Sequence, residues 1–185
     1  MSIEIFKPTL LLASILVLGG CDRVMYTPSC SSVGPADYGS RFTTLRNGVI
    51  SDSDTDLSWY RCPFGTNYNG LNTCLGSPVL LPLQDAQLVV EETARKAFVT
   101  WRLPTIKEFQ TILREDCENP ALDPVLFPGS LSENHWTSDN FDPESSLGCA
   151  VYSYQGSSSC RLKKDNLYQL MIVTDQALNS NYTKT

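Results

Sequence analysis

Seven cysteines in 185 residues constrain the fold of this chain more than any other feature of its sequence. Cys21 closes an apolar N-terminal segment, and the other six are spread over the rest of the chain: Cys30, Cys62, Cys74, Cys117, Cys149 and Cys160. An even number of cysteines in an exported chain predicts disulfides formed in an oxidising compartment. We therefore expect a domain braced by three bridges.

The spacing of these six cysteines favours one pairing among many. Cys62 and Cys74 flank a loop rich in Gly and Asn, and Cys149 and Cys160 flank one rich in Gly and Ser. Two local bridges would leave Cys30 and Cys117 to tie the N-terminal arm to the middle of the domain. A zinc site is the alternative, but the chain has a single histidine, His135, and no Cys-x-x-Cys pair. We expect neither a metal nor a cofactor.

The first 20 residues have the features of a secretory signal peptide. Residues 10–18 form an apolar run that is too short to span a bilayer and fits the h-region of a removed signal. The following Leu18-Gly19-Gly20-Cys21 resembles a lipobox, in which small residues enter the protease cleft and the cysteine thiol accepts diacylglycerol. We expect lipidation at Cys21, with residues 21–40 forming the lipidated cysteine and a tether. An ordinary signal peptide followed by a chance cysteine is the alternative.

The predicted location is the envelope of a Gram-negative bacterium, where the lipid on Cys21 holds the chain at a membrane. Several acyl chains on one residue anchor a protein stably, whereas one chain binds only marginally. Asp22 resembles a signal that retains lipoproteins at the inner membrane of enteric bacteria. Because this signal is not universal, the choice between inner and outer membrane stays open.

Composition excludes some partners. Removal of residues 1–20 leaves 165 residues, enough for one domain with a core. The removed piece carries one Lys and one Glu, so the mature chain keeps the formal charge of −6. A surface of this sign repels nucleic acid and heparin-like polymers.

The hydrophobic pattern predicts one small α+β domain over residues 41–175, with a tail at 176–185. A helix is expected over residues 84–97, with an apolar side made of Ala86, Val89, Val90, Ala94 and Ala97. A second helix should begin near Thr105, where Thr105 and Glu108 have capping-box spacing, with Pro104 in its first turn. Its buried stripe would consist of Ile106, Phe109, Ile112 and Leu113. Strands are expected from Phe42, around a turn at Asn47-Gly48, at Trp136, at residues 150–152 and at residues 167–173.

Three stretches of the sequence together resemble a known family. They are residues 47–62, which end in Trp59-Tyr60-Arg61-Cys62; residues 101–109, Trp-Arg-Leu-Pro-Thr-Ile-Lys-Glu-Phe; and residues 117–138, with Cys-Glu-Asn-Pro and His-Trp-Thr-Ser. They are similar to the C-terminal domain of the Legionella collagen-like protein, over about residues 41–173. The resemblance implies a fold of C-type-lectin-like or sulfatase-modifying-factor-like type, with two helices, small antiparallel sheets and long loops.

The sequence departs from the family pattern at three places. Asp56 stands where the family has glycine, and we expect the turn to survive because aspartate tolerates the left-handed conformation. The segment 167–173 lacks the arginines that often end the family's domain. The collagen-like region is also absent, so polymer binding attributed to that region does not carry over.

The aromatic and arginine residues of the motifs are expected to be structural. Trp101 and Leu103 should lie in the core, and Arg102 should pair with a carboxylate. Trp59 and Trp136 are also expected in the core, although folds of this type do bind ligands through exposed aromatic rings.

Acidic residues offer weak candidates for a metal or sugar site. Asp52, Asp54 and Asp56 alternate, but Leu57 and Pro63 occupy the positions where an EF-hand needs Gly and Glu. A solvated turn is expected there, with a loose calcium site as the alternative. The Glu118-Asn119-Pro120 triplet does not have the order used by calcium-dependent lectins for sugar binding.

The sequence gives little support for catalysis. His135 has no recognisable nucleophile motif beside it, and we expect it to be a packing residue. The metal-binding cysteines of the sulfatase-modifying relatives have no free counterpart if all six cysteines are paired. We therefore expect no enzymatic activity.

The function expected from these observations is a membrane-anchored binding or interaction module in adhesion or envelope assembly. Loops between Ser130 and Asp165 form the expected recognition surface, with Tyr152, Tyr154 and Tyr168 as contact residues. Partners would be an envelope protein or a glycan. The alternatives are a structural subunit of a secretion, pilus or adhesion assembly, and an enzyme acting on a cell-wall or glycan substrate.

Overall fold

The computed structural model of the chain describes residues 26–45, 47–140, 142 and 144–178. The predicted signal peptide, Cys21 and Asp22 lie outside these residues, as does most of the predicted C-terminal tail. In the described ranges, no helix combines the length and the apolar character needed to cross a membrane.

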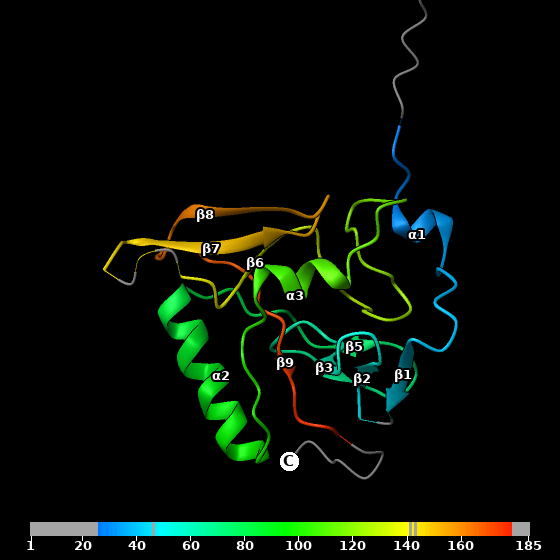
Figure 1. Cartoon of the computed structure of the whole chain (residues 1–185), viewed down its shortest axis with the longest axis horizontal. Coiled ribbons are helices and arrows are strands. Elements are labelled where there is room, and N and C mark those ends of the chain that lie inside the picture. The colour runs from blue at the N-terminus through cyan, green and yellow to red at the C-terminus, as the bar shows by residue number, and fades with distance from the viewer. Residues whose placement is uncertain (1–25, 46, 141, 143, 179–185) are drawn as a thin grey trace, which may run out of the picture.

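The domain is a small α+β fold, as expected, with short helices and three antiparallel sheets (Figure 1). The four-stranded sheet has the order β1-β2-β3-β9, with β1 at Phe42–Leu45, β2 at Val49–Asp52, β3 at Leu57–Tyr60 and β9 at Val173–Thr174. Asp56 closes the β2–β3 turn with a φ of 56°. The prediction that aspartate would take the left-handed conformation of the family's glycine is therefore confirmed.

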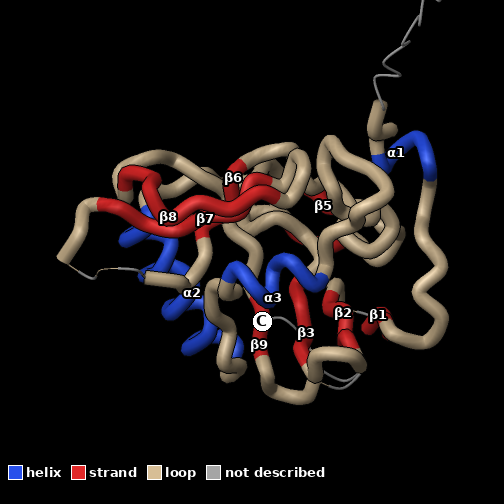
Figure 2. The backbone as a smooth tube through the Cα atoms, turned by 45° about the horizontal axis from the view of Figure 1, so that its top comes forward, coloured by secondary structure: helices blue, strands red, loops and turns tan. Residues whose placement is uncertain are grey.

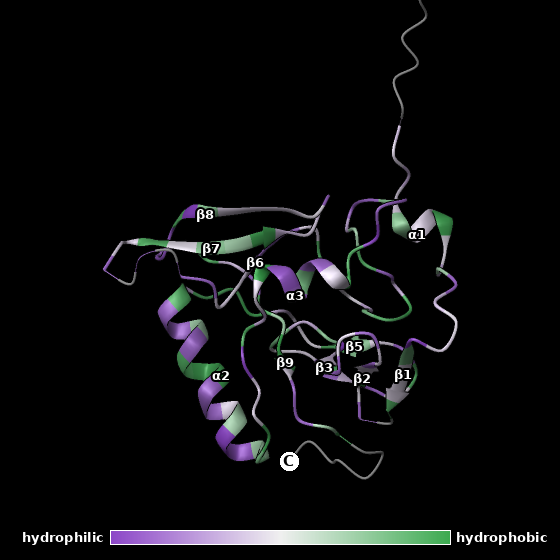
Figure 3. Ribbon diagram, viewed as in Figure 1, coloured by the Kyte–Doolittle hydropathy of each residue, from purple (hydrophilic) through white to green (hydrophobic). Residues whose placement is uncertain are grey.

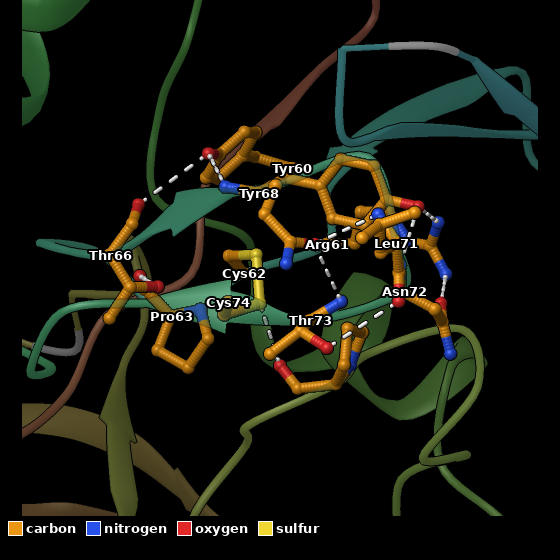
Figure 4. The surroundings of a disulfide bond; sticks show 12 residues. Tyr60, Arg61, Cys62, Pro63, Thr66, Tyr68, Leu71, Asn72, Thr73 and Cys74 are labelled. Atoms are coloured by element: carbon orange, nitrogen blue, oxygen red, sulfur yellow. Dashed lines mark hydrogen bonds between the residues drawn. A yellow bond between two sulfur atoms is a disulfide. The ribbon is translucent and has the colours of Figure 1, made fainter.

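A short hairpin follows the first three strands. Its strands are β4 at Asn67–Tyr68 and β5 at Cys74–Leu75. The disulfide between Cys62 and Cys74 fastens this hairpin to the end of β3 (Figure 4).

Two helices form where the periodicity predicted them. Helix α2 spans Leu83–Ala97 and turns its alanine and valine side to the core, while polar residues alternate with apolar ones along its length (Figure 3). Helix α3 spans Ile106–Thr111. The Thr105 hydroxyl accepts from the Glu108 N–H, and the Glu108 carboxylate accepts from the Thr105 N–H, so the capping box is confirmed. Pro104 precedes the capping residue, so the expectation that it lies in the first helical turn was wrong.

The third sheet has the order β6-β7-β8, with β6 at Asn134–Trp136, β7 at Leu147–Tyr152 and β8 at Ser157–Lys163. It occupies much of the region where we expected long recognition loops. The Ser-rich stretch 157–159 pairs with residues 150–152 of β7 instead of forming a loop. The third disulfide, Cys149–Cys160, joins these two strands.

The N-terminal arm is part of the fold. Helix α1 spans Cys30–Val33, and the buried Cys30 is bridged to Cys117. The Cys30 N–H donates to the Glu118 carbonyl, and the Glu118 N–H donates to the Pro28 carbonyl, both at 2.9 Å. The predicted tie between Cys30 and Cys117 is present, so the part of the expected tether from Pro28 onward is held against the domain. The three bridges are the pairs that the spacing predicts.

The segment 167–173, expected as one strand, pairs with several neighbours in turn. Tyr168 pairs with Leu81, Gln169 bridges His135, and Val173 pairs with Arg102. Only Val173–Thr174 forms a strand, β9. This segment runs between the two larger sheets, and its residues 169–174 are buried.

Two hydrophobic clusters make up the core. One contains Trp101 and Trp136 and packs under α2, and the other contains Trp59 and Phe109 and lies between α3 and the first sheet. The expectation that these tryptophans are core residues agrees with their burial.

Candidate functional site: a polar groove beside the β7–β8 turn

A groove of about 550 Å³ opens on the surface of the described residues. It lies between the end of α3, the segment that follows it to Glu118, and the β7–β8 turn. The turn approaches α3 closely, because a Cβ placed on Gly156 would lie 2.8 Å from the Leu113 side chain. The lining residues are Thr27, Gln110, Leu113, Arg114, Glu115, Cys117, Glu118, Gln155 and Gly156.

Arg114 is the cation of this groove, and its charge is already balanced. Its guanidinium donates to both carboxylate oxygens of Asp116, at 2.9 and 2.7 Å, and lies 3.6 Å from the buried Asp123 carboxylate. It also donates to the Gly34 carbonyl. The hydrogen bond from Arg114 lowers the pKa of Asp116. Arg114 therefore holds the wall of the groove in place.

Amide and carboxylate groups remain for a ligand. Gln110, Glu115 and Gln155 are exposed, and Glu118 is half-buried. Amides both donate and accept hydrogen bonds, whereas ionised carboxylates only accept. The groove thus offers hydrogen bonds to hydroxyl and N–H groups, and its two carboxylates oppose anions.

Two of the three predicted contact tyrosines lie beside the groove. The Tyr154 hydroxyl donates to Glu118 Oε1 at 3.1 Å, and this bond raises the pKa of Tyr154. The rings of Tyr152 and Tyr154 stack with centroids 5.8 Å apart and an angle of 14° between planes. Tyr152 also lines a smaller hollow of about 200 Å³ with Asn134 and residues 157–159.

Tyr168 does not join this pair. Its ring packs on Trp136 at 4.6 Å between centroids, and its hydroxyl accepts from Asn166. Tyr168 is half-buried against the core cluster under α2, so its role is structural.

Of the three alternating aspartates, Asp52 and Asp54 form ion pairs with Arg41. Both carboxylate oxygens of Asp52 accept from Arg41, at 2.8 and 2.7 Å, and they also accept from Asp54 N–H and Thr55 hydroxyl. Burial raises the pKa of Asp52, but these bonds outweigh it and lower the pKa overall. In the part of the chain that the structure describes, no three His, Cys, Asp or Glu side chains gather as metal ligands would.

The motif at residues 101–109 is a structural unit. Arg102 donates to both oxygens of the Glu108 carboxylate, at 2.8 and 2.7 Å, which lowers the pKa of Glu108. The predicted pairing of Arg102 with a carboxylate is confirmed, and the partner also caps α3. The arginine and the glutamate of the motif thus position the helix that forms one wall of the groove.

His135 is buried between the two larger sheets. Its Nδ1–H donates to the Glu133 carbonyl at 3.0 Å, while Nε2 has no partner among the described residues. Burial lowers the pKa of His135 to about 4. The side chain packs on Phe109, with ring centroids 5.2 Å apart, as expected for a packing residue.

Arg61 is a structural residue that the sequence reasoning missed. It is buried, its guanidinium lies over the Tyr68 ring, and it donates to Asn72 Oδ1 at 2.5 Å (Figure 4). It also donates to the Leu126 carbonyl at 3.0 Å and to the Val125 carbonyl. The Trp-x-Arg-Cys pattern was the available signal, since it places Arg61 directly before a bridged cysteine.

The groove itself was also missed. The sequence predicts no ligand contact for Glu118, Gln110 or Gln155. One sequence feature did point to this place, because Gln155 lies between Ser130 and Asp165, where the recognition loops were expected.

The chain belongs to the family of the Lcl C-terminal domain, whose model matches residues 48–174. The resemblance to the Legionella collagen-like protein is therefore confirmed. Membership indicates a bacterial protein associated with the cell surface or adhesion. Comparison with curated proteins and with solved structures gave no match.

Proposed function

We propose that the protein is a lipoprotein of the bacterial envelope whose domain, of C-type-lectin-like type, binds a polar ligand without catalysing a reaction. The groove beside the β7–β8 turn carries this proposal, because it is a hollow of about 550 Å³ lined by exposed amide and carboxylate side chains. The family supports a role at the surface, and the lipobox-like sequence ending at Cys21 supports lipid anchoring.

The ligand should be a neutral glycan or a segment of another envelope protein. Gln110 and Gln155 can donate to and accept from hydroxyls or peptide groups, and the Glu115 and Glu118 carboxylates can accept from them. The same carboxylates and the formal charge of −6 disfavour sulfated or phosphorylated polymers. Tyr152 and Tyr154 supply a rigid aromatic edge next to these polar groups.

Two observations support a binding role over catalysis. His135, the only histidine, is buried and cannot reach a ligand in the groove or elsewhere on the surface. The six cysteines of the domain are joined in disulfides and are not free to hold a catalytic metal.

The test uses the lipid-free mature chain on a glycan panel and in pull-down from envelope extract. Gln155→Ala and Glu118→Gln each change one polar group of the groove, and Glu91→Ala, on the exposed side of α2, is the control. Loss of one hydrogen bond to the ligand should weaken binding by about fivefold to tenfold.

Unchanged affinity in both groove variants would place the ligand elsewhere. Turnover of a panel glycan would contradict the non-enzymatic role. Stable incorporation into a large envelope complex, insensitive to groove variants, would favour a structural subunit instead.

A further inference from the structure

The N-terminal arm leaves the domain at a fixed point. The Cys30–Cys117 bridge and the two backbone hydrogen bonds between residues 28–30 and Glu118 hold the arm to the fold. Tyr26 is the first described residue beyond this attachment. If Cys21 carries lipid, as the proposed function requires, Tyr26 is only five positions along the chain from the membrane anchor. Such a segment spans at most about 18 Å, so the attachment point stays close to the bilayer.

Exposed apolar side chains surround this attachment point. Tyr26 is 83% exposed and Val33, on α1, is 43% exposed. Leu131 is 48% exposed and belongs to the loop that touches the same segment, because Ser132 Oγ donates to Asn119 Oδ1 at 2.6 Å. We call Tyr26, Val33 and Leu131 the exit face.

The loop that carries Leu131 also contacts the β4–β5 hairpin. The Cys74 side chain lies against the loop that leads to Leu131, since a Cβ on Gly129 would lie 3.4 Å from the Cys74 Cβ. The next residue, Leu75, is also exposed. Apolar groups clustered on one part of a surface indicate an interaction site, whereas single exposed apolar residues are ordinary.

We propose that the exit face rests on the lipid bilayer, with Tyr26, Val33 and Leu131 inserted among the headgroups. The short tether favours the bilayer as the occupant, because it keeps Tyr26 within about 18 Å of the lipidated cysteine for as long as the anchor is in place. Asp37 and Glu133 are exposed carboxylates near the exit face in sequence, so it fits a zwitterionic surface better than an anionic one. Thr27 lines the groove, so the docked domain holds the groove mouth at the edge of the bilayer.

Quenching by brominated lipid tests this contact in the lipidated mature protein, which begins at Cys21. Leu131→Trp places a reporter on the exit face, and Val33→Trp is a second reporter on α1. Phe98→Trp is the matched control, because Phe98 is 89% exposed and ends α2, which lies across the molecule from α1 in both views (Figures 1 and 2). The native tryptophans are buried and give all three variants the same background.

In phosphatidylcholine vesicles with brominated acyl chains, both exit-face reporters should lose most of their added emission, and the Phe98→Trp reporter should lose none. Adding phosphatidylglycerol should reduce the quenching. Exit-face reporters quenched no more than the control, in protein that floats with the vesicles, would overturn the docking while leaving the anchor intact. Protein that does not float with the vesicles would overturn the lipid anchor of the proposed function, and the docking with it.

Discussion

Acid should destabilise the protein through its single histidine. The pKa of His135 is lowered to about 4 by burial in the folded state, from 6.5 when exposed. Above pH 6.5 the imidazole is neutral in both states, and the full stability is present. Between pH 6.5 and 4 the unfolded chain takes up a proton that the folded chain refuses, so the free energy of unfolding falls with pH.

The size of the effect follows from the two pKa values. A difference of about 2.5 in pKa corresponds to about 3 kcal/mol of lost stability once the pH is below 4. This is a large part of the roughly 5–15 kcal/mol that is typical of a folded domain, so the loss should be measurable.

Two assays measure this effect. Urea unfolding at a series of pH values should show that the wild type loses about 3 kcal/mol more than His135→Gln between pH 7 and 4, because only the wild type titrates here. Nuclear magnetic resonance gives the pKa directly, since one histidine gives unambiguous imidazole signals. A folded-state midpoint near 6.5, or equal pH dependence in the two proteins, would refute the reasoning.

Further substitutions at Asp56, at Glu108 and at two of the disulfides test the scaffold by urea unfolding. Asp56→Ala should lower stability by about 1 kcal/mol and Asp56→Gly should not, because Asp56 has a positive φ; equal losses would contradict the turn geometry. Glu108→Ala removes the carboxylate that caps α3 together with Thr105 and that pairs with Arg102. It should cost about 1–2 kcal/mol, whereas no loss would show that the motif is not structural. Removing the Cys30–Cys117 bridge, whose residues are 87 apart, should cost about 4–5 kcal/mol, against about 3 kcal/mol for the Cys62 bridge, whose residues are 12 apart; the reverse order would count against the entropic account.

The sequence predicted what local patterns determine. The 3.6-residue periodicity of residues 84–97 and the Thr105–Glu108 spacing produced α2 and α3, because both depend on neighbouring residues. The left-handed turn at Asp56 was predictable for the same reason. The same hydrophobic pattern supplied the expectation of an α+β domain, and the family resemblance agreed with it.

Features that depend on distant residues were missed. Residues 28–40 have the composition of a tether, and the cysteine spacing predicted the bridge to Cys117, but the hydrogen bonds of residues 28–30 with Glu118 could be found only in the structure. Residues 157–159 are polar and resemble a loop, yet they pair with β7 because Cys160 is tied to Cys149. The segment 167–173 was expected as one strand, but its pairing is divided among several neighbours.

The groove also could not be predicted from the sequence, because its lining residues come from distant parts of the chain. Gln110 and Gln155 are 45 positions apart in the sequence, and only the packing of the β7–β8 turn on α3 brings them to one cavity. The spacing of residues along the chain does not predict that these two glutamines line one cavity. Tyr154 was predicted from composition, whereas its bond to Glu118 could be found only in the structure.

The intact mass of the protein, extracted from membranes without reducing agent, tests the central claim most directly. The account predicts a chain of 165 residues that begins at Cys21, carries diacylglycerol and further acyl groups on that residue, and lacks six hydrogens because three disulfides are formed. A chain that begins elsewhere, that has no lipid on Cys21, or that has a free thiol among the other six cysteines would contradict it.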